Sequence, residues 1–163
     1  MSVALVTGAA RGIGRAIALE LFAAGFSVAL ADREPISPLE GDPHRWMVLP
    51  LDIADLDAHG DAIAAVEAKL GPIDCLVNNA GVTSLVRGDM LDLTPEGFDR
   101  SLSINLRGTF FLTQAVARRM VKNAQNDANK SGTWRSIITI SSANAEIVGE
   151  NRACLLYTSD AAD

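Results

Sequence analysis

The sequence is poor in the residue types that build metal sites, disulfide frameworks and membrane spans. It has two cysteines and two histidines among 163 residues, in no metal-ligand spacing. We therefore expect no metal site and no disulfide framework, and we interpret His44 and His59 as surface residues. No apolar run approaches the length of a membrane helix, and the first one, Val3–Val6, is too short for a signal peptide. The expected compartment is a reducing cytoplasm.

Positive charge is also scarce, since 14 lysines and arginines face 20 acidic residues, for a net charge of −6. A nucleic acid or an anionic membrane is therefore not an expected partner, because neither is attracted to an acidic surface without a basic patch. The densest basic cluster, Arg118, Arg119 and Lys122, lies where we expect a helix to end, and there it suits the helix dipole.

Hydrophobic residues make up 48% of the chain and form short apolar runs that alternate with helical patterns. This alternation predicts one α/β domain with a parallel sheet covered on both faces. Trp46 and Trp134 are expected at strand starts, packed in the core or at its rim. The predicted strands are Val3–Thr7, Phe26–Ala31, Trp46–Leu51, Ile73–Asn78 and Ser136–Ser141. The predicted helices are Arg15–Ala24, Leu56–Leu70 capped by Asp55, and a region from the Thr94 cap to about Lys122 with a break near Asn105. The proline-containing segment Arg33–Arg45 is predicted to be a loop or a short broken helix.

A glycine-rich segment stands between the first strand and the first helix. Gly8, Gly12 and Gly14 allow close approach of a ligand to the backbone at a helix N-terminus, which is where pyrophosphate groups bind. Asp32 follows the second strand and completes a strand–helix–strand context. In that context dinucleotide binding is favoured over a purely structural turn.

The spacing of these glycines and four later motifs resemble the short-chain dehydrogenase/reductase family. The segment TGAARGIG at 7–14 resembles its TGxxxGxG loop, and NNAG at 78–81 resembles its NNAG motif. Asp52 is similar to its adenine-contacting aspartate, Asn105 to its catalytic asparagine and Ser142 to its catalytic serine. The resemblance covers residues 1–153 and is greatest to bacterial 3-oxoacyl-[acyl-carrier-protein] reductase-like members. It implies a doubly wound, Rossmann-like sheet in the order 3-2-1-4-5, truncated after strand five, with two further strands absent. The implied cofactor residues are Thr7, Gly8, Arg11, Gly12, Ile13, Gly14, Asp32, Arg33, Asp52, Ile53, Asn79, Ala80 and Gly81.

Cofactor preference is predicted from charge. Asp32 can accept hydrogen bonds from a ribose hydroxyl of NAD and repels the 2′-phosphate of NADP. Arg11 and Arg33 favour the opposite choice, because either can reach a phosphate. We expect NAD(H), with NADP(H) as the alternative.

The resemblance also implies a Tyr-x-x-x-Lys pair after strand five, which this sequence lacks. The family's tyrosine position corresponds to Leu155, whereas Tyr157 is followed four positions later by Ala161, and no lysine follows Lys130. The segment 154–163 does not resemble the family. It can be encoded by DNA similar to the reverse complement of a transposase sequencing adapter, so we interpret it as a foreign tail on a partial domain, residues 1–153.

The expected function is therefore that of an oxidoreductase fragment. The parent enzyme would interconvert a carbonyl and a secondary alcohol on a small-molecule or acyl-carrier-linked substrate, and the fragment would be inactive. A sugar, polyol or other small-alcohol dehydrogenase of the same family is an alternative, as is a nucleotide-binding module without catalysis. The resemblance also implies a homo-oligomeric parent.

Overall fold

The computed structural model of the chain describes residues 1–83, 90–126 and 134–142. It contains a five-stranded parallel sheet in the order β3-β2-β1-β4-β5, which confirms the predicted fold class and strand order. The strands are β1 (Val3–Thr7), β2 (Ser27–Asp32), β3 (Trp46–Pro50), β4 (Ile73–Asn78) and β5 (Ser136–Thr139). The helices are α1 (Gly12–Ala23), α2 (Ala58–Leu70), α3 (Pro95–Ser101) and α4 (Thr109–Asn126), with two short 3₁₀ helices, η1 (Pro43–Arg45) and η2 (Met90–Asp92), and a π-helical segment, η3 (Leu102–Gly108).

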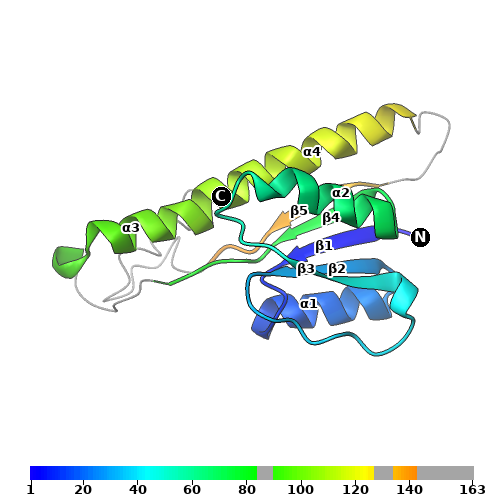
Figure 1. Ribbon diagram of the computed structural model, residues 1–163, viewed down its shortest axis with the longest axis horizontal. Helices are drawn as coiled ribbons and strands as arrows, with labels where there is room; N and C mark the ends of the chain where they lie inside the picture. The colour runs from blue at the N-terminus through cyan, green and yellow to red at the C-terminus, as the bar shows by residue number, and fades with distance from the viewer. Residues whose placement is uncertain (84–89, 127–133, 143–163) are drawn as a thin grey trace.

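The sheet lies between two layers of helices. Figure 1 shows α2 and the long α4 on one face and α1 on the other. Alternate residues of the central strands point to opposite faces, so β1 contributes Val3 and Leu5 to the core under α2 and α4, and Ala4 and Val6 to the core under α1. The near-continuous apolar strands are thus explained by burial on both faces.

The connection between β2 and β3 contains no α-helix, as its prolines predict. It lies against α1, where the Arg15 guanidinium donates hydrogen bonds to the carbonyl oxygens of Ser37 (2.6 Å) and Pro38 (2.9 Å). Leu39 is buried in the core under α1. This loop therefore covers sheet surface that a crossover helix covers in a regular doubly wound fold.

The helical region after β4 has the predicted start and a longer extent. Thr94 caps α3 by accepting a hydrogen bond from the Gly97 amide at 3.2 Å, and Pro95 occupies the first helical position. The predicted break near Asn105 is a π-helical segment, η3, which joins α3 to α4. Helix α4 ends at Asn126 rather than near Lys122. The basic cluster thus precedes the last turn, and Arg119 instead pairs with Glu67 of α2 at 3.8 Å.

Three smaller expectations need correction. Helix α2 begins at Ala58, because Asp55 accepts its hydrogen bond from the Asp57 amide in the turn that precedes the helix. Strand β5 ends at Thr139, two residues early. Trp134 precedes β5 and is 89% exposed rather than packed, whereas Trp46 begins β3 and packs against the core under α1.

The segment 154–163, with Tyr157, lies outside the described residues. No helix in the described ranges is long and apolar enough to cross a membrane.

Candidate functional site

The loop between β1 and α1 is shaped by close backbone contacts. Gly8 and Gly12 have φ values of 67° and 58°, a region that side chains other than glycine disfavour. Gly14 packs against the loop, since a Cβ there would collide with the Gly8 carbonyl oxygen and the Asn79 amide. A Cβ on Gly12, in contrast, would meet nothing within 4 Å. The tight turn thus leaves open space at the start of the helix.

The N-terminus of α1 is suited to an anion. Its N-cap residue, Arg11, makes no capping hydrogen bond with its side chain, and the first turn contains no acidic residue. The first amides of a helix have no partner within the helix, and the helix dipole favours negative charge there. These features fit the pyrophosphate of a dinucleotide.

Thr7 and Asn79 join the ends of β1 and β4 behind this loop. The Thr7 hydroxyl donates to the Val77 carbonyl at 3.3 Å and accepts from the amides of Asn79 and Ala80, both at 3.0 Å. The Asn79 side chain donates to the carbonyls of Thr7 at 3.0 Å and Gly8 at 3.3 Å. Thr7 therefore fixes the start of the glycine-rich loop to the backbone at the end of β4, and Asn79 holds the loop through the loop's own carbonyls.

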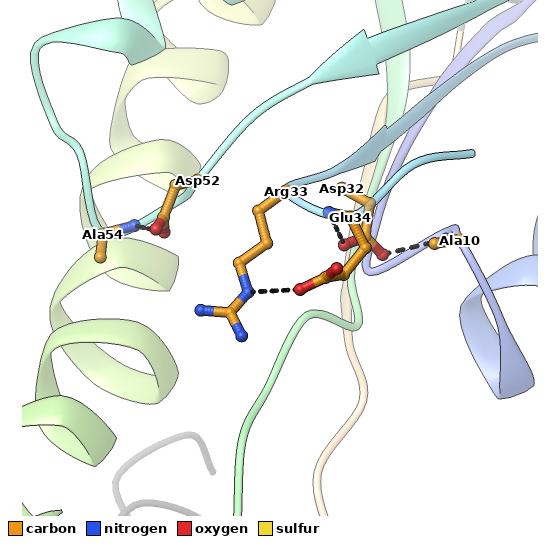
Figure 2. A network of polar contacts seen from close by, with 6 residues as sticks. All are labelled: Ala10, Asp32, Arg33, Glu34, Asp52 and Ala54. Carbon is orange, nitrogen blue, oxygen red and sulfur yellow. Dashed lines mark hydrogen bonds and ion pairs between the residues drawn. The ribbon is translucent and has the colours of Figure 1, made fainter.

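Asp32 lies beside the same loop, at the carboxyl end of β2. One oxygen of its carboxylate accepts a hydrogen bond from the Ala10 amide at 2.9 Å, and the other accepts from the Glu34 amide at 3.0 Å (Figure 2). Each carboxylate oxygen keeps a further lone pair for a ligand hydroxyl. Asp52, after β3, accepts from the Ala54 amide at 2.9 Å in the same way.

These segments surround a cavity of about 350 Å³ at the carboxyl edge of the sheet. Ligands of open α/β sheets bind at this edge, where the strand order reverses. The cavity is lined by most of the cofactor residues expected from the sequence: Gly8, Arg11, Gly12, Ile13, Asp32, Arg33, Asp52, Ile53, Asn79, Ala80 and Gly81. Thr7 and Gly14 do not belong to the lining and instead shape the loop behind it. The lining residues that the sequence did not indicate are Ala31, Glu34, Leu51, Val82 and Ile104.

The wall formed by Ile53 is supported from behind by His59, which was wrongly predicted to be a surface residue. His59 is only 3% exposed, and its Nε2 donates to the Ile53 carbonyl at 2.9 Å. Gly108 of η3 packs so closely on the same carbonyl that a Cβ would collide with it. The sequence did contain a signal for this burial, because His59 precedes Ala62, Ile63 and Val66 at the spacing of the buried face of a helix.

The two predicted catalytic residues, Asn105 and Ser142, are not among the described residues that line the cavity. The side-chain oxygen of Asn105 accepts a hydrogen bond from the backbone N–H of Val82 at 2.8 Å, and its side-chain nitrogen donates one to the Val82 carbonyl at 2.9 Å. Asn105 therefore joins η3 to the segment after β4. Ser142 follows β5 and is half-buried. In the part of the chain that the structure describes, neither side chain lines the cavity, although Val82 and Ile104 beside Asn105 do. The roles of Ser142 and Asn105 stay predictions.

Comparison with known families agrees with this architecture. The sequence profile described as short chain dehydrogenase matches residues 2–159. The chain belongs to this family. The match continues past Ala153 into the segment that we interpret as foreign, so the domain boundary there also stays a prediction.

Short chain dehydrogenases with different names are similar to the chain. It is 41% identical to D-threitol dehydrogenase of Mycolicibacterium smegmatis over 126 residues, covering 74% of the chain and 48% of that protein. It is 35% identical to acetoacetyl-CoA reductase of Shinella zoogloeoides, covering 88% of the chain and 56% of that protein. The chain thus spans about half the length of these curated relatives.

A solved structure shares the fold. The chain superposes on the 3-oxoacyl-[acyl-carrier protein] reductase from Brucella melitensis in complex with NAD with a TM-score of 0.84 and 38% sequence identity. The superposition covers 99% of the chain and 63% of that structure. The described cavity therefore belongs to a fold in which a relative was solved with NAD.

Proposed function

We propose that this chain is the cofactor-binding part of an NAD-dependent dehydrogenase or reductase that interconverts a carbonyl and a secondary alcohol. The observation that carries this proposal is that residues of the glycine-rich loop, Asp32 and Asp52 all line the same cavity. A bound dinucleotide would supply the hydride acceptor or donor.

Different residues of the cavity bind different parts of the dinucleotide. The amides at the start of α1 bind the pyrophosphate, and Gly12 leaves the space for it. Asp32, already oriented by the Ala10 amide, accepts hydrogen bonds from ribose hydroxyls and disfavours a 2′-phosphate. Asp52 and Ile53 form the wall for the adenine. Ser142 then hydrogen-bonds the substrate oxygen, and Asn105 positions the groups that relay the proton.

Titration of the chain with NAD and with NADP, followed by calorimetry, tests the cofactor proposal. We expect NAD to bind more tightly, and an Asp32→Ala exchange to lower this preference. Because Asp32 also holds the Ala10 amide, the exchange will weaken binding of both cofactors as well. An unchanged NAD/NADP ratio in the variant would contradict the role of Asp32.

The substrate class is proposed from the family rather than from the cavity. A 3-oxoacyl substrate on an acyl carrier is our first choice, and a sugar, polyol or other small alcohol is the second. The names of the similar acetoacetyl-CoA reductase and D-threitol dehydrogenase support one class each. Assay of the full-length parent with a 3-oxoacyl thioester and with a polyol distinguishes them.

A nucleotide-binding module without catalysis is the second candidate function. The sequence observation that favours it is the lack of a Tyr-x-x-x-Lys pair after Ser142. In the source DNA, an intact reading frame that encodes this pair beyond codon 153 would support the enzyme. A frame that lacks the pair, in a protein that still binds NAD, would support the module.

We also propose that the parent acts in the cytoplasm as a homo-oligomer. Helix α4 exposes Phe110, Phe111 and Val121, an apolar surface that pairing through this helix would cover. Sedimentation of the parent and of its Phe110→Lys variant tests this, since the variant should dissociate more readily.

A further inference from the structure

The cavity wall next to Asp32 carries an ion pair that bears on the choice of cofactor. Arg33 and Glu34 both line the cavity, and the Arg33 Nε lies 3.4 Å from the Glu34 Oε1. Figure 2 shows the Arg33 side chain extended from the end of β2 with the Glu34 carboxylate beside it. The cation that follows Asp32 in the sequence is thus paired with an acid.

The position of Glu34 follows from the local backbone. Its amide donates to the Asp32 carboxylate at 3.0 Å, and this turn brings the Glu34 side chain next to Arg33. Asp32 itself is held from the other side by the Ala10 amide at 2.9 Å. Three consecutive residues therefore form one unit: a fixed carboxylate, a cation and an acid that neutralises the cation.

The charge balance of the wall supports this interpretation. The charged residues of the lining are Arg11, Asp32, Arg33, Glu34 and Asp52. Two positive charges and three negative charges leave a formal charge of −1, and Glu34 offsets part of the Arg33 charge, because the pair is exposed to solvent and involves only the Arg33 Nε. A 2′-phosphate at this wall would meet the repulsion of Asp32 and would compete with Glu34 for Arg33.

We propose that Glu34 is a second determinant of the preference for NAD over NADP, because it keeps Arg33 from binding a 2′-phosphate. The inference rests on the proposed function, since it requires that the cavity bind a dinucleotide. It separates two opposed effects: Asp32 disfavours NADP directly, whereas Arg33, one of the two cations that could favour NADP, is paired with its neighbour Glu34.

The test is a Glu34→Gln exchange in the 163-residue chain, with NAD and NADP titrated separately by calorimetry. The amide of glutamine keeps the size of the side chain and the backbone bond to Asp32, and it removes the charge. We expect NADP to bind about 2- to 5-fold more tightly than it binds the unchanged chain, the upper range of a surface ion pair. The affinity for NAD should change by less than about 2-fold.

Two controls identify the cause. In the double variant Glu34→Gln with Arg33→Gln, the gain for NADP should disappear, because the freed guanidinium is what binds the phosphate. Glu20→Gln, on the exposed surface of α1 outside the cavity lining, makes the same change in net charge and should leave both affinities unchanged.

Each outcome has a distinct meaning. If the unchanged chain binds NAD and Glu34→Gln gains no affinity for NADP, this inference is overturned and the proposed function stands. A gain that persists in the double variant, or that Glu20→Gln reproduces, also overturns it, because the effect is then general electrostatics. If neither cofactor binds the unchanged chain, the proposed function fails, and the inference fails with it.

Discussion

The two edge strands of the sheet differ in their surroundings. Leu49 of β3 is buried in the core with Ile63 and Val66 of α2. All four residues of β5 are exposed, and Ile137 and Ile138 lie open although they pair in register with buried residues of β4. Among the described residues, the β3 edge of the sheet is therefore partly covered, whereas the β5 edge is exposed.

The largest expected effect is on catalysis, the function that depends on the β5 side. The chain as given should show no dehydrogenase activity, because it lacks the Tyr-x-x-x-Lys pair that would perform the general acid–base step, worth about 10²–10⁴-fold. Replacing residues 154–163 with a relative's sequence, with tyrosine at position 155 and lysine at 159, should create NAD-dependent turnover. Absorbance of the reduced nicotinamide measures it.

The control for this experiment is the same extension with phenylalanine instead of tyrosine. It should bind NAD equally well and turn over at least about 10²-fold more slowly. Measurable turnover by the unchanged 163-residue chain would contradict the predicted need for the pair.

The second prediction compares lysine substitutions at two paired positions, one in β4 and one in β5. Val77 is 2% exposed and pairs with Ile138, which is 47% exposed. Val77→Lys buries an unpaired charge and should cost about 3–5 kcal/mol, a large part of the 5–15 kcal/mol of a typical domain. Ile138→Lys should change stability by about 0.5 kcal/mol or less and reduce aggregation, since charge blocks edge-to-edge pairing of strands.

Chemical denaturation and light scattering of the two variants measure these effects. Similar losses of stability at the two positions would mean that β5 is as well covered as β4, and the contrast between the two sides of the sheet would be lost.

The third prediction concerns the glycine-rich loop alone. Gly14→Ala places a methyl group against the Gly8 carbonyl and should cost about 1–3 kcal/mol, together with most of the NAD affinity. Gly60→Ala is the matched control, because Gly60 lies inside α2, where an added methyl group would meet nothing within 4 Å. This control should gain about 0.5–1 kcal/mol and bind NAD normally. Thermal melts and NAD titration measure both, and equal behaviour of the variants would contradict the close packing of the loop.

The positions of the strands, the glycine-rich loop and Asp32 could be predicted from the sequence because each depends on local or periodic patterns. The strand order depends on which segments touch, and it was predicted only from the family resemblance. The hydrogen bond between Asp32 and the Ala10 amide could not be predicted, because its donor is a backbone N–H and every residue except proline carries one. Glu34 was missed for a similar reason, since only the turn after β2 places it in the cavity wall.

Residue types were misleading where a polar or aromatic side chain has two possible environments. Trp134 is large and apolar and was expected to pack in the core or at its rim, yet the short strand β5 begins two residues later and Trp134 is exposed. His59 is polar and was expected at the surface, yet the helical spacing of α2 turns it inward. In both cases the position on the element decided the burial, and the residue type did not.

The smallest predicted effect tests whether His59 supports the cofactor wall. Removal of its Nε2 donor in His59→Leu leaves the buried Ile53 carbonyl without that partner, which should cost about 1–3 kcal/mol of stability. Because Ile53 lines the cavity beside Asp52, we also expect NAD and AMP to bind a few-fold more weakly. The binding of nicotinamide mononucleotide should not change, since it lacks the adenosine. Calorimetry with the three ligands measures the pattern.

His59→Gln is the control, because its amide can donate a hydrogen bond from nearly the same place. It should recover part of the stability and part of the affinity for AMP. If His59 served only to fill volume, the polar glutamine would restore neither. Equal weakening of all three ligands in His59→Leu would instead indicate a general loosening of the fold. In that case the buried histidine stabilises the fold as a whole and does not specifically position the Ile53 wall of the cavity.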